Sequence, residues 1–413
     1  MSIAIRPTAV VHPGDLLTRR QRIVYIVILG ALVALGPFTI DLYLPAFPVI
    51  EGDLGVSQAA VQLTLTATTI GFGVGQLLVG PWSDRVGRRL PLIVATSLHV
   101  LASVGVALAP DIGWIAVFRV LQGMGAAAGA VVAMATVRDL FGGQPLVRML
   151  SRLALVTGLA PILAPVIGSQ LLLVLDWRGV FYFLAAYGVL VLLSAIFFIV
   201  ETRPKESRET SDRTMAQRYG AIFRDRVFIG VAVIGGMSFS GLFAYLSASP
   251  FLFQDLYGLD AQQYGLLFAV NSVGIVIGTQ TSARLARIVG PQWILAFSTA
   301  VVFLSSSAIV VLDLADAGLL GVLVPLWFFI TAVGFGFPMV QVLALAGHGS
   351  EAGTAASVLG ALNFGLAGLI SPIVGLFGVS AFVMGLVMAS TAFVAVLSLW
   401  FIVQPRTVPP LSH

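Results

Sequence analysis

The chain has no cysteine and little charge. Of its 413 residues only 10% are charged and 58% are hydrophobic, whereas soluble domains carry about 25% charged residues. Without cysteine the chain can form neither disulfides nor thiolate metal sites. The histidines (His12, His99, His348 and His413) are scattered without the spacing of metal ligands. We therefore expect no metal and no cofactor, and the scarcity of charge indicates that lipid, rather than water, covers most of the protein.

Long apolar runs follow one another with little sequence between them. A hydrocarbon core about 30 Å thick needs about 20 apolar residues per helical span, and continuous rather than alternating runs favour helices over strands. The sequence predicts an all-α integral membrane protein with twelve transmembrane helices. These spans are expected near 23–49, 58–80, 91–109, 113–136, 149–175, 179–200, 226–253, 261–283, 293–312, 318–345, 353–378 and 380–403.

Positive charge is confined to alternate loops. All but two of the 22 Lys and Arg residues fall on one predicted side; Arg178 lies on the other side and Arg119 lies within a span. The opposite loops carry acidic residues: Glu51, Asp53, Asp111, Asp176, Asp255, Asp260, Asp313 and Asp316. Because cytoplasmic loops are positive, we expect both termini in the cytoplasm. The net charge of +4 therefore reflects topology, and no nucleic-acid partner is expected.

The longest hydrophilic stretch divides the spans six and six. This predicts an N-terminal six-helix bundle at 23–200 and a C-terminal six-helix bundle at 226–403, joined by a cytoplasmic linker at 201–225. Cytoplasmic tails are expected at 1–22 and 404–413. The equal halves indicate a duplicated six-span unit.

Two charged residues lie well inside predicted spans, Asp41 in the first and Arg119 in the fourth. Ionisable groups inside a membrane are costly and are therefore candidates for function. Asp41 follows Arg22 by nineteen residues, and Arg119 precedes Arg138 by nineteen. At about 1.5 Å per helical residue, both lie about 28 Å from these anchors. We expect them to pair or to share a water-filled cavity.

Burial disfavours the charged form of a carboxyl group, whereas a nearby guanidinium favours it. Asp41 under both influences could change protonation as the cavity changes, while Arg119 stays charged. One interpretation is that Asp41 carries a coupling proton and Arg119 tunes it or orients a substrate. The alternative is a fixed structural ion pair. Pro37 and Pro45 flank Asp41 and should break the local helical hydrogen bonding.

The loop after the second span, here called the gating loop, is rich in glycine and arginine. Its acidic residue could meet a helix N-terminus, where anions are favoured, while its arginines bind acidic groups on another loop. Such contacts would form a latch that opens and closes; a simple positive anchor on the cytoplasmic side is the alternative. The residues concerned are Gly80, Asp84, Arg85, Gly87, Arg88 and Arg89.

Proline and glycine also interrupt the fifth span. Pro161, Pro165 and Gly168 predict a kinked, closely packed helix that could act as a hinge or seal. Candidates for lining a substrate cavity are Phe38, Tyr43, Gly123, Asn271 and Asn363. For Gly123 and the small residues after it, close helix packing is the preferred interpretation.

These segments together resemble the major facilitator superfamily, specifically its twelve-span drug:proton antiporters. Gly80 to Arg89 is similar to the signature loop between helices 2 and 3, and Arg119-Val-Leu-Gln-Gly-Met-Gly125 is similar to the helix 4 motif. Asp41-Leu-Tyr-Leu-Pro-Ala46 resembles the helix 1 motif of the Bcr/CflA drug-resistance branch. Ala164-Pro165 and Gly168 resemble the antiporter motif of helix 5, with Ser169 in place of a glycine.

The resemblance implies alternating access between two six-helix bundles, and a monomer that exports chloramphenicol-, bicyclomycin- or sulfonamide-like drugs in exchange for protons. It also implies a bacterial cytoplasmic (inner) membrane, with Asp41 as the proton-linked acid. A facilitator dedicated to one endogenous metabolite or nutrient is the alternative. An enzyme is not expected, because the sequence contains no catalytic constellation and no phosphate-binding loop. A channel would show repeated filter segments.

Overall fold

The structure is a computed structural model that describes residues 13–202, 220, 222–346 and 352–408. Within these residues, twelve helices are long and apolar enough to cross a membrane, and each overlaps one of the predicted spans. They are α1 (Arg19–Asp41) with α2 (Phe47–Leu54), α3 (Gln58–Val86), α4 (Arg89–Ala107), α5 (Ile112–Leu140), α6 (Gly143–Leu171), α7 (Trp177–Phe198), α9 (Arg226–Pro250), α10 (Ala261–Val289), α11 (Pro291–Leu314), α12 (Gly318–Ala346), α13 (Ala352–Ile370) and α15 (Ala381–Leu397). The predicted all-α fold is confirmed.

Shorter helical turns extend or link these helices. The 3₁₀ turn η2 (Leu44–Ala46) interrupts the first span at Pro45, as expected, whereas α1 continues through Pro37, where a break was also expected. A π-helical turn, η4 (Phe251–Leu256), extends α9, and a second one, η6 (Ser398–Val403), extends α15. The remaining short elements are η1 (Pro13–Leu16), α14 (Ile373–Leu376) and η7 (Pro405–Thr407).

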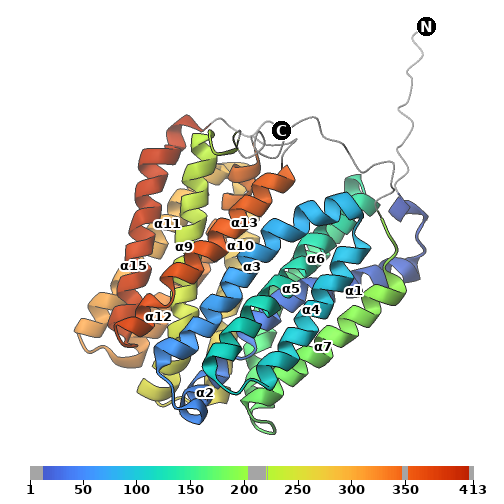
Figure 1. The fold of residues 1–413 in the computed structure, drawn as a ribbon. Coiled ribbons are helices and arrows are strands. Elements are labelled where there is room, and N and C mark those ends of the chain that lie inside the picture. Colours follow the sequence, from blue (N-terminus) through green and yellow to red (C-terminus); the bar gives the residue numbers. More distant parts are fainter. Residues whose placement is uncertain (1–12, 203–219, 221, 347–351, 409–413) are drawn as a thin grey trace.

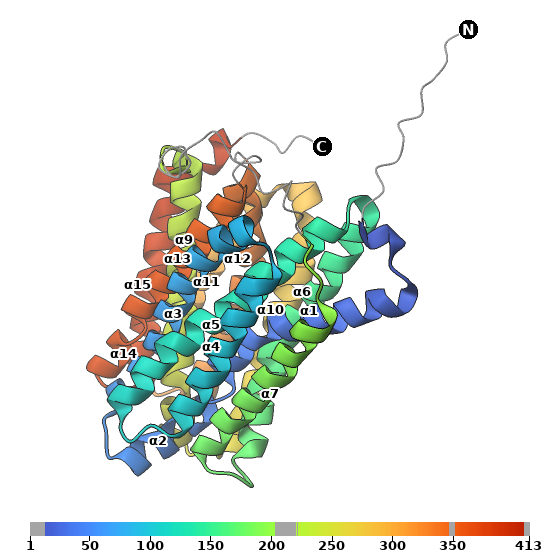
Figure 2. The ribbon, with the colours of Figure 1, turned by 45° about the vertical axis from the view of Figure 1, so that its right-hand side comes forward.

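The helices form two six-helix bundles, α1–α7 and α9–α15, which lie side by side (Figure 1). They meet where α13 packs on α3 and where α10 packs on α6. Most of the predicted linker, residues 203–219 and 221, lies outside the described residues, as do 1–12 and 409–413 of the predicted tails. Seen from the second angle, the first bundle leans away from the second towards one end of the molecule (Figure 2).

Three acidic residues of the loops opposite the basic ones cap the N-termini of helices. Asp111, Asp176 and Asp260 are N-caps of α5, α7 and α10, and their carboxylates accept hydrogen bonds from the first free backbone N–H groups. Asp53 in the same set accepts hydrogen bonds from the side chains of Trp177 and Arg178, each at 2.9 Å. The one arginine predicted on this side thus has its own acidic partner.

Small residues bring helices into backbone contact in both bundles. A Cβ added to Gly123 on α5 would collide with the carbonyl oxygen of Thr68 on α3. In the second bundle, a Cβ on Gly278 of α10 would collide with the carbonyl oxygen of Thr331 on α12. Because α3–α5 and α10–α12 are equivalent pairs, this shared packing supports the duplicated six-span unit.

The bundles are joined by hydrogen bonds at the end opposite the gating loop and, through Ser272, further along α10. Side chains of the second bundle donate them to backbone oxygens of the first bundle. The pairs are Gln254 Nε2 to Pro45 at 3.2 Å, Gln262 Nε2 to Ser169 at 3.0 Å and Ser272 Oγ to Pro161 at 3.5 Å. The bundles are therefore held together at the end towards which they converge in Figure 2.

Candidate functional site

Arg119 is completely buried within the first bundle. Its Nη1 donates to the backbone oxygen of Thr39 at 3.0 Å and to Gln122 Oε1 at 2.6 Å. Thr39 lies in the last turn of α1, where carbonyl groups have no partner in their own helix. A guanidinium is favoured there because the C-terminal end of a helix is partly negative. The end of α1 thus holds Arg119.

Tyr43 lies directly against this guanidinium. Its ring centroid is 3.9 Å from Arg119 Cζ, and the ring of Phe181 is 5.7 Å from the same atom. The Tyr43 hydroxyl is 3.2 Å from Thr64 Oγ1. Aromatic faces attract a cation, most strongly where water is excluded. They therefore stabilise the Arg119 charge without supplying an anion.

A third set of contacts fixes the orientation of Gln122. Its Nε2 donates to Ser103 Oγ at 2.7 Å, and Ser103 Oγ donates to the backbone oxygen of His99 at 2.7 Å. His99 Nδ1 lies 3.3 Å from the backbone oxygen of Gln122, which can only accept, so that nitrogen carries the proton. With its nitrogen on Ser103, Gln122 turns its oxygen towards Arg119. This network was missed by the sequence analysis, which considered His99 only as a metal ligand.

Asp41 is the last residue of α1 and is 5% exposed. In the described part of the chain, no ion pair or hydrogen bond of its carboxyl group is found, with Arg119 or any other residue. The two residues lie at one level, as predicted, because Arg119 reaches Thr39 two positions before Asp41. The predicted alternative of a fixed Asp41–Arg119 ion pair is not what the structure contains.

Asp41 lies within electrostatic range of tyrosines of both bundles. Electrostatic interactions connect it to Tyr43 in the first bundle and to Tyr245 and Tyr264 in the second. Tyr245 accepts a hydrogen bond from Asn271 Nδ2 at 3.2 Å, and the Tyr264 hydroxyl is 2.9 Å from Ser249 Oγ. These second-bundle residues are all buried. Asp41 therefore faces a polar cluster on the opposite bundle, here called the tyrosine cluster (Tyr245, Ser249, Tyr264 and Asn271).

The other cavity candidates have different surroundings. Phe38 stacks on Tyr187, with ring centroids 5.3 Å apart. Gly123 packs against α3, which is the helix-packing role preferred for it from the sequence. Asn363 lies on α13, and its Oδ1 is buried without a hydrogen-bond partner in the described residues. Of the five candidates, Tyr43 and Asn271 take part in the arrangement around Arg119 and the tyrosine cluster.

Helix α6 passes through both of its prolines and contacts two partners. The backbone oxygen of Pro161 accepts a hydrogen bond from Ser272 of the second bundle. A Cβ added to Gly265 of α10 would lie 3.1 Å from the Pro165 oxygen. On another side, Gly168 is so close to the backbone oxygen of Leu42 that a Cβ would collide with it. The predicted hinge or seal thus touches both the second bundle and the residue next to Asp41.

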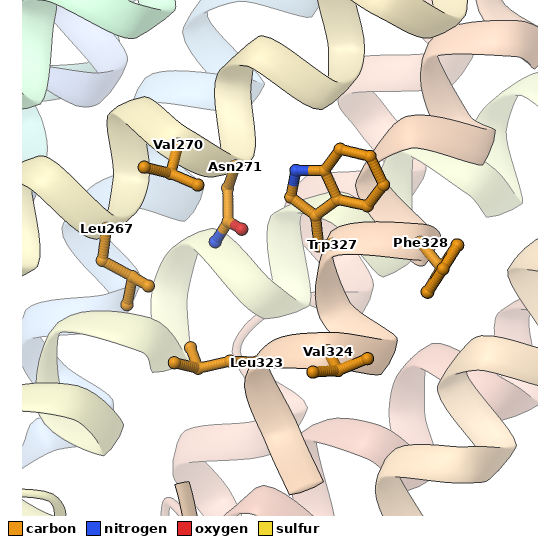
Figure 3. Close-up of a pocket in the computed structure, with 7 residues that line it drawn as sticks. All are labelled: Leu267, Val270, Asn271, Leu323, Val324, Trp327 and Phe328. Atoms are coloured by element: carbon orange, nitrogen blue, oxygen red, sulfur yellow. The ribbon is translucent and has the colours of Figure 1, made fainter. Parts of the chain in front are cut away.

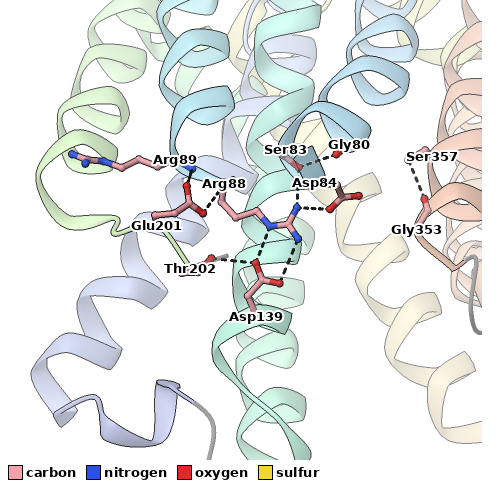
Figure 4. Close-up of polar contacts among 10 residues, drawn as sticks. All are labelled: Gly80, Ser83, Asp84, Arg88, Arg89, Asp139, Glu201, Thr202, Gly353 and Ser357. Atoms are coloured by element: carbon pink, nitrogen blue, oxygen red, sulfur yellow. Dashed lines mark hydrogen bonds and ion pairs between the residues drawn. The ribbon is translucent and has the colours of Figure 1, made fainter. Parts of the chain in front are cut away.

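At the other end of the first bundle, Arg88 organises the gating loop (Figure 4). Its Nε donates to Asp139 Oδ2 at 2.8 Å, and its Nη1 donates to Asp84 Oδ1 at 2.7 Å and to Ser83 Oγ at 3.0 Å. Burial lowers the pKa of a guanidinium, but the hydrogen bonds and charges of Asp139 and Asp84 outweigh it and raise the pKa of Arg88. Arg88 thus binds an acidic residue near the end of helix α5, whereas the sequence led us to expect an acidic partner on another loop.

Glu201, just after α7, completes this arrangement. Its carboxylate accepts hydrogen bonds from the backbone N–H groups of Arg88 at 2.9 Å and Arg89 at 3.2 Å. Gly87 has φ +104°, and a side chain there would collide with Glu201. Glycine is therefore required at this turn. Neither Glu201 nor Asp139 was predicted from the sequence, although each ends a span next to basic residues.

The remaining loop residues are placed as follows. A Cβ on Gly80 would lie 3.4 Å from Ser357 Oγ in α13, so this end of α3 approaches the second bundle. Asp84, one helical turn further along, is therefore level with the first turn of α13. Arg85 is exposed and makes no hydrogen bond or ion pair within the described residues. Arg89 donates to the backbone oxygen of Ile196 at 2.7 Å.

Comparison with known proteins identifies the family of this chain. The profile of the Major Facilitator Superfamily matches residues 26–372, which is most of the chain. The chain belongs to the Major Facilitator Superfamily. As a member of this superfamily it is a multi-pass membrane transporter rather than an enzyme, and the resemblance drawn from its motifs is confirmed.

Several curated members of the superfamily are similar along most of their length. YdgK of Bacillus subtilis, an uncharacterized MFS-type transporter, is 34% identical over 392 residues, which cover 94% of this chain and 98% of YdgK. A bicyclomycin resistance protein homolog of Haemophilus influenzae is 30% identical over 357 residues, covering 86% and 90%. Multidrug resistance protein MdtL of Escherichia coli is 31% identical over 331 residues, covering 80% and 83%.

Solved superfamily structures share the fold at low sequence identity. The xylose transporter XylE from E. coli, in a partially occluded inward open conformation, superimposes with a TM-score of 0.72 at 15% identity, over 94% of this chain and 98% of XylE. An inward-facing bacterial homolog of the lysosomal transporter Spinster gives 0.69 at 15% identity, over 95% and 98%. These likenesses concern the fold alone.

Proposed function

We propose that this superfamily member is a proton-coupled antiporter that exports small, largely apolar drug-like molecules by alternating access. It works as a monomer in the bacterial cytoplasmic membrane, with both termini in the cytoplasm. The proton gradient drives it without a cofactor.

The environment of Asp41 is the observation that carries this proposal. A buried carboxylate without an ion-pair partner is costly, and protonation removes that cost. Asp41 faces the tyrosine cluster across the boundary between the bundles, so movement of one bundle against the other changes what surrounds its carboxyl group. In this proposal Asp41 takes up a proton in one state and releases it in the other, while Arg119 stays charged against α1 and Tyr43.

Aromatic rings at the boundary between the bundles support an apolar substrate. Phe72 of α3 stacks on Phe364 of α13 at 5.0 Å, and Phe239 of α9 meets Phe364 at 4.9 Å. Both bundles therefore offer aromatic surface at their contact, and such surface suits the apolar body of a drug. The names of two relatives, bicyclomycin resistance protein homolog and multidrug resistance protein, support the drug class.

The test uses purified protein in liposomes with a pH-sensitive dye inside and chloramphenicol or a lipophilic dye as substrate. Wild type is compared with Asp41→Asn, and Glu51→Gln serves as a control carboxylate in the same span but outside the site. We expect substrate-dependent proton movement in wild type and in Glu51→Gln, and none in Asp41→Asn. Exchange of labelled for unlabelled substrate, which needs no net proton movement, should survive in Asp41→Asn.

Each result other than this has a definite meaning. Proton-coupled export that persists in Asp41→Asn would reject Asp41 as the proton carrier. Substrate transport without proton movement in wild type would reject the antiporter. Failure to transport any of a broad panel of drugs, with uptake of a single metabolite instead, would favour the dedicated carrier.

A further inference from the structure

A pocket of about 270 Å³ lies between α10 and α12 of the second bundle (Figure 3). It is lined by Leu267, Val270, Asn271, Leu323, Val324, Trp327 and Phe328. The side chains of Val270, Val324 and Phe328 are about half exposed, at 51%, 53% and 51%. Asn271 is ten residues into α10, about 15 Å along a membrane-spanning helix. The pocket therefore opens to the hydrocarbon core of the bilayer.

Two polar groups face this apolar pocket without a protein partner. Asn271 is 3% exposed; its Nδ2 donates to Tyr245, but its Oδ1 accepts no hydrogen bond in the described residues. The indole N–H of Trp327 likewise has no acceptor within the described part of the chain, and Figure 3 shows it on the Asn271 side of the ring. One acceptor and one donor thus lie together where no water is available to satisfy them.

This combination selects a particular kind of occupant. A lipid acyl chain could fill the volume but would leave both polar groups unsatisfied. A charged group would find no countercharge, because all seven lining residues are uncharged. A hydroxyl or amide group on an apolar body can donate to Asn271 Oδ1 and accept from the Trp327 indole N–H, which satisfies both at once.

We propose that the α10–α12 pocket binds uncharged amphipathic molecules from the bilayer, each with an apolar body and one hydroxyl or amide group. Asn271 belongs to both this pocket and the tyrosine cluster, since its amide nitrogen donates to Tyr245. An occupant that orders Asn271 therefore orders the residue that faces Asp41. The inference deepens the proposed function, on which it rests for the role of the occupant as substrate; binding itself needs no proton coupling.

The experiment uses photolabelling of the protein in nanodiscs with two matched probes, a diazirine-bearing undecan-1-ol and an undecane with the same diazirine. Labelled peptides are mapped by mass spectrometry, and labelling of α10 and α12 is divided by labelling of the lipid-facing surface of α7. Two hydrogen bonds correspond to about a tenfold preference for the alcohol. Trp327→Phe should reduce this preference to about threefold, and Asn271→Leu should abolish it. Asn363→Leu, which changes a partly buried asparagine on α13, should leave it unchanged.

Equal normalised labelling by the two probes would overturn the proposal, because the pocket would then be an ordinary lipid-filled groove. Absence of labelling by either probe would also overturn it. If Asn271→Leu fails to fold, Trp327→Phe alone still decides, since it removes only the donor. Repeating the measurement in Asp41→Asn separates the two proposals. The alcohol preference should persist there even if proton-coupled export proves wrong.

Discussion

Replacing Arg88 by glutamine removes the guanidinium that holds two acidic side chains at one end of the first bundle. The Arg88 side chain is 6% exposed, and its partners Asp139 and Asp84 are 21% and 56% exposed. Asp139 lies at the end of α5 and Asp84 at the end of α3. The substitution therefore leaves two carboxylates near each other without their shared cation, and it loosens the attachment of α3 to α5.

The magnitude follows from the burial of these groups. Exposed ion pairs contribute up to about 1 kcal/mol, whereas removing one partner of a buried pair costs about 3–5 kcal/mol. The Arg88–Asp139 pair lies between these cases, so we expect a coupling energy of about 2 kcal/mol. Asp139→Asn should cost less, about 1–2 kcal/mol, because Arg88 keeps Asp84 as a partner. Arg88→Gln should cost about 3 kcal/mol, because it removes the shared cation from both acids.

The assay is a double-mutant cycle on the free energy of unfolding, measured by titrating the purified protein with SDS. Arg88→Gln, Asp139→Asn and the double variant are compared, with Arg85→Gln as the control because Arg85 is an exposed neighbour. The double variant should lose about 2 kcal/mol less than the sum of the single losses. Additive losses, or a loss in Arg85→Gln equal to that in Arg88→Gln, would refute the reasoning.

Three further predictions concern the region around Asp41. Gly168→Ala should cost about 1–3 kcal/mol of stability and lower proton-coupled export, because the added Cβ displaces the end of α1. Gly365→Ala is the control, because a Cβ added there has no neighbouring atom within 4 Å. Equal effects of the two substitutions would contradict the prediction. Tyr43→Leu should destabilise the protein by about 1–2 kcal/mol more than Tyr43→Phe in the same SDS titration, because only the leucine variant loses the ring against Arg119. Gln254→Leu should raise labelling of a single engineered cysteine at the converged end of the bundles by about fivefold, since it removes one hydrogen bond between them. The cysteine-free chain gives this labelling no background, and unchanged labelling would refute that role.

The membrane spans could be predicted because lipid imposes a simple requirement. Each crossing needs a continuous apolar run, and the twelve runs correspond to the observed helices. The common level of Asp41 and Arg119 could also be predicted, because the rise of a helix depends only on the number of residues. Residue counting could not predict that Arg119 bonds to the Thr39 carbonyl rather than to the Asp41 carboxylate. That outcome depends on where α1 ends and on the side-chain rotamer.

Apart from Asn271, the members of the tyrosine cluster were missed for a different reason. Tyr245 and Tyr264 are buried aromatic residues in apolar helices, and nothing in the local sequence distinguishes them from ordinary core residues. Their position opposite Asp41 arises from how the second bundle packs on the first, which is a long-range property. Asp139 could have been found, since an acid beside an arginine at the end of a span is a natural partner for a basic loop.

The two bundles contribute different groups to the hydrogen bonds between them. Pro165 has no N–H, so the backbone oxygen of Pro161 is left without its helical partner and is free to accept from Ser272. In all three contacts the first bundle supplies a main-chain oxygen and the second supplies a side chain. Substitutions of the first-bundle side chains at these contacts can therefore keep the hydrogen bonds between the bundles, provided that Pro165 remains. In the second bundle these contacts tolerate few substitutions, because each needs a side-chain donor. The hydrogen bonds between the bundles therefore depend mainly on the sequence of the second bundle.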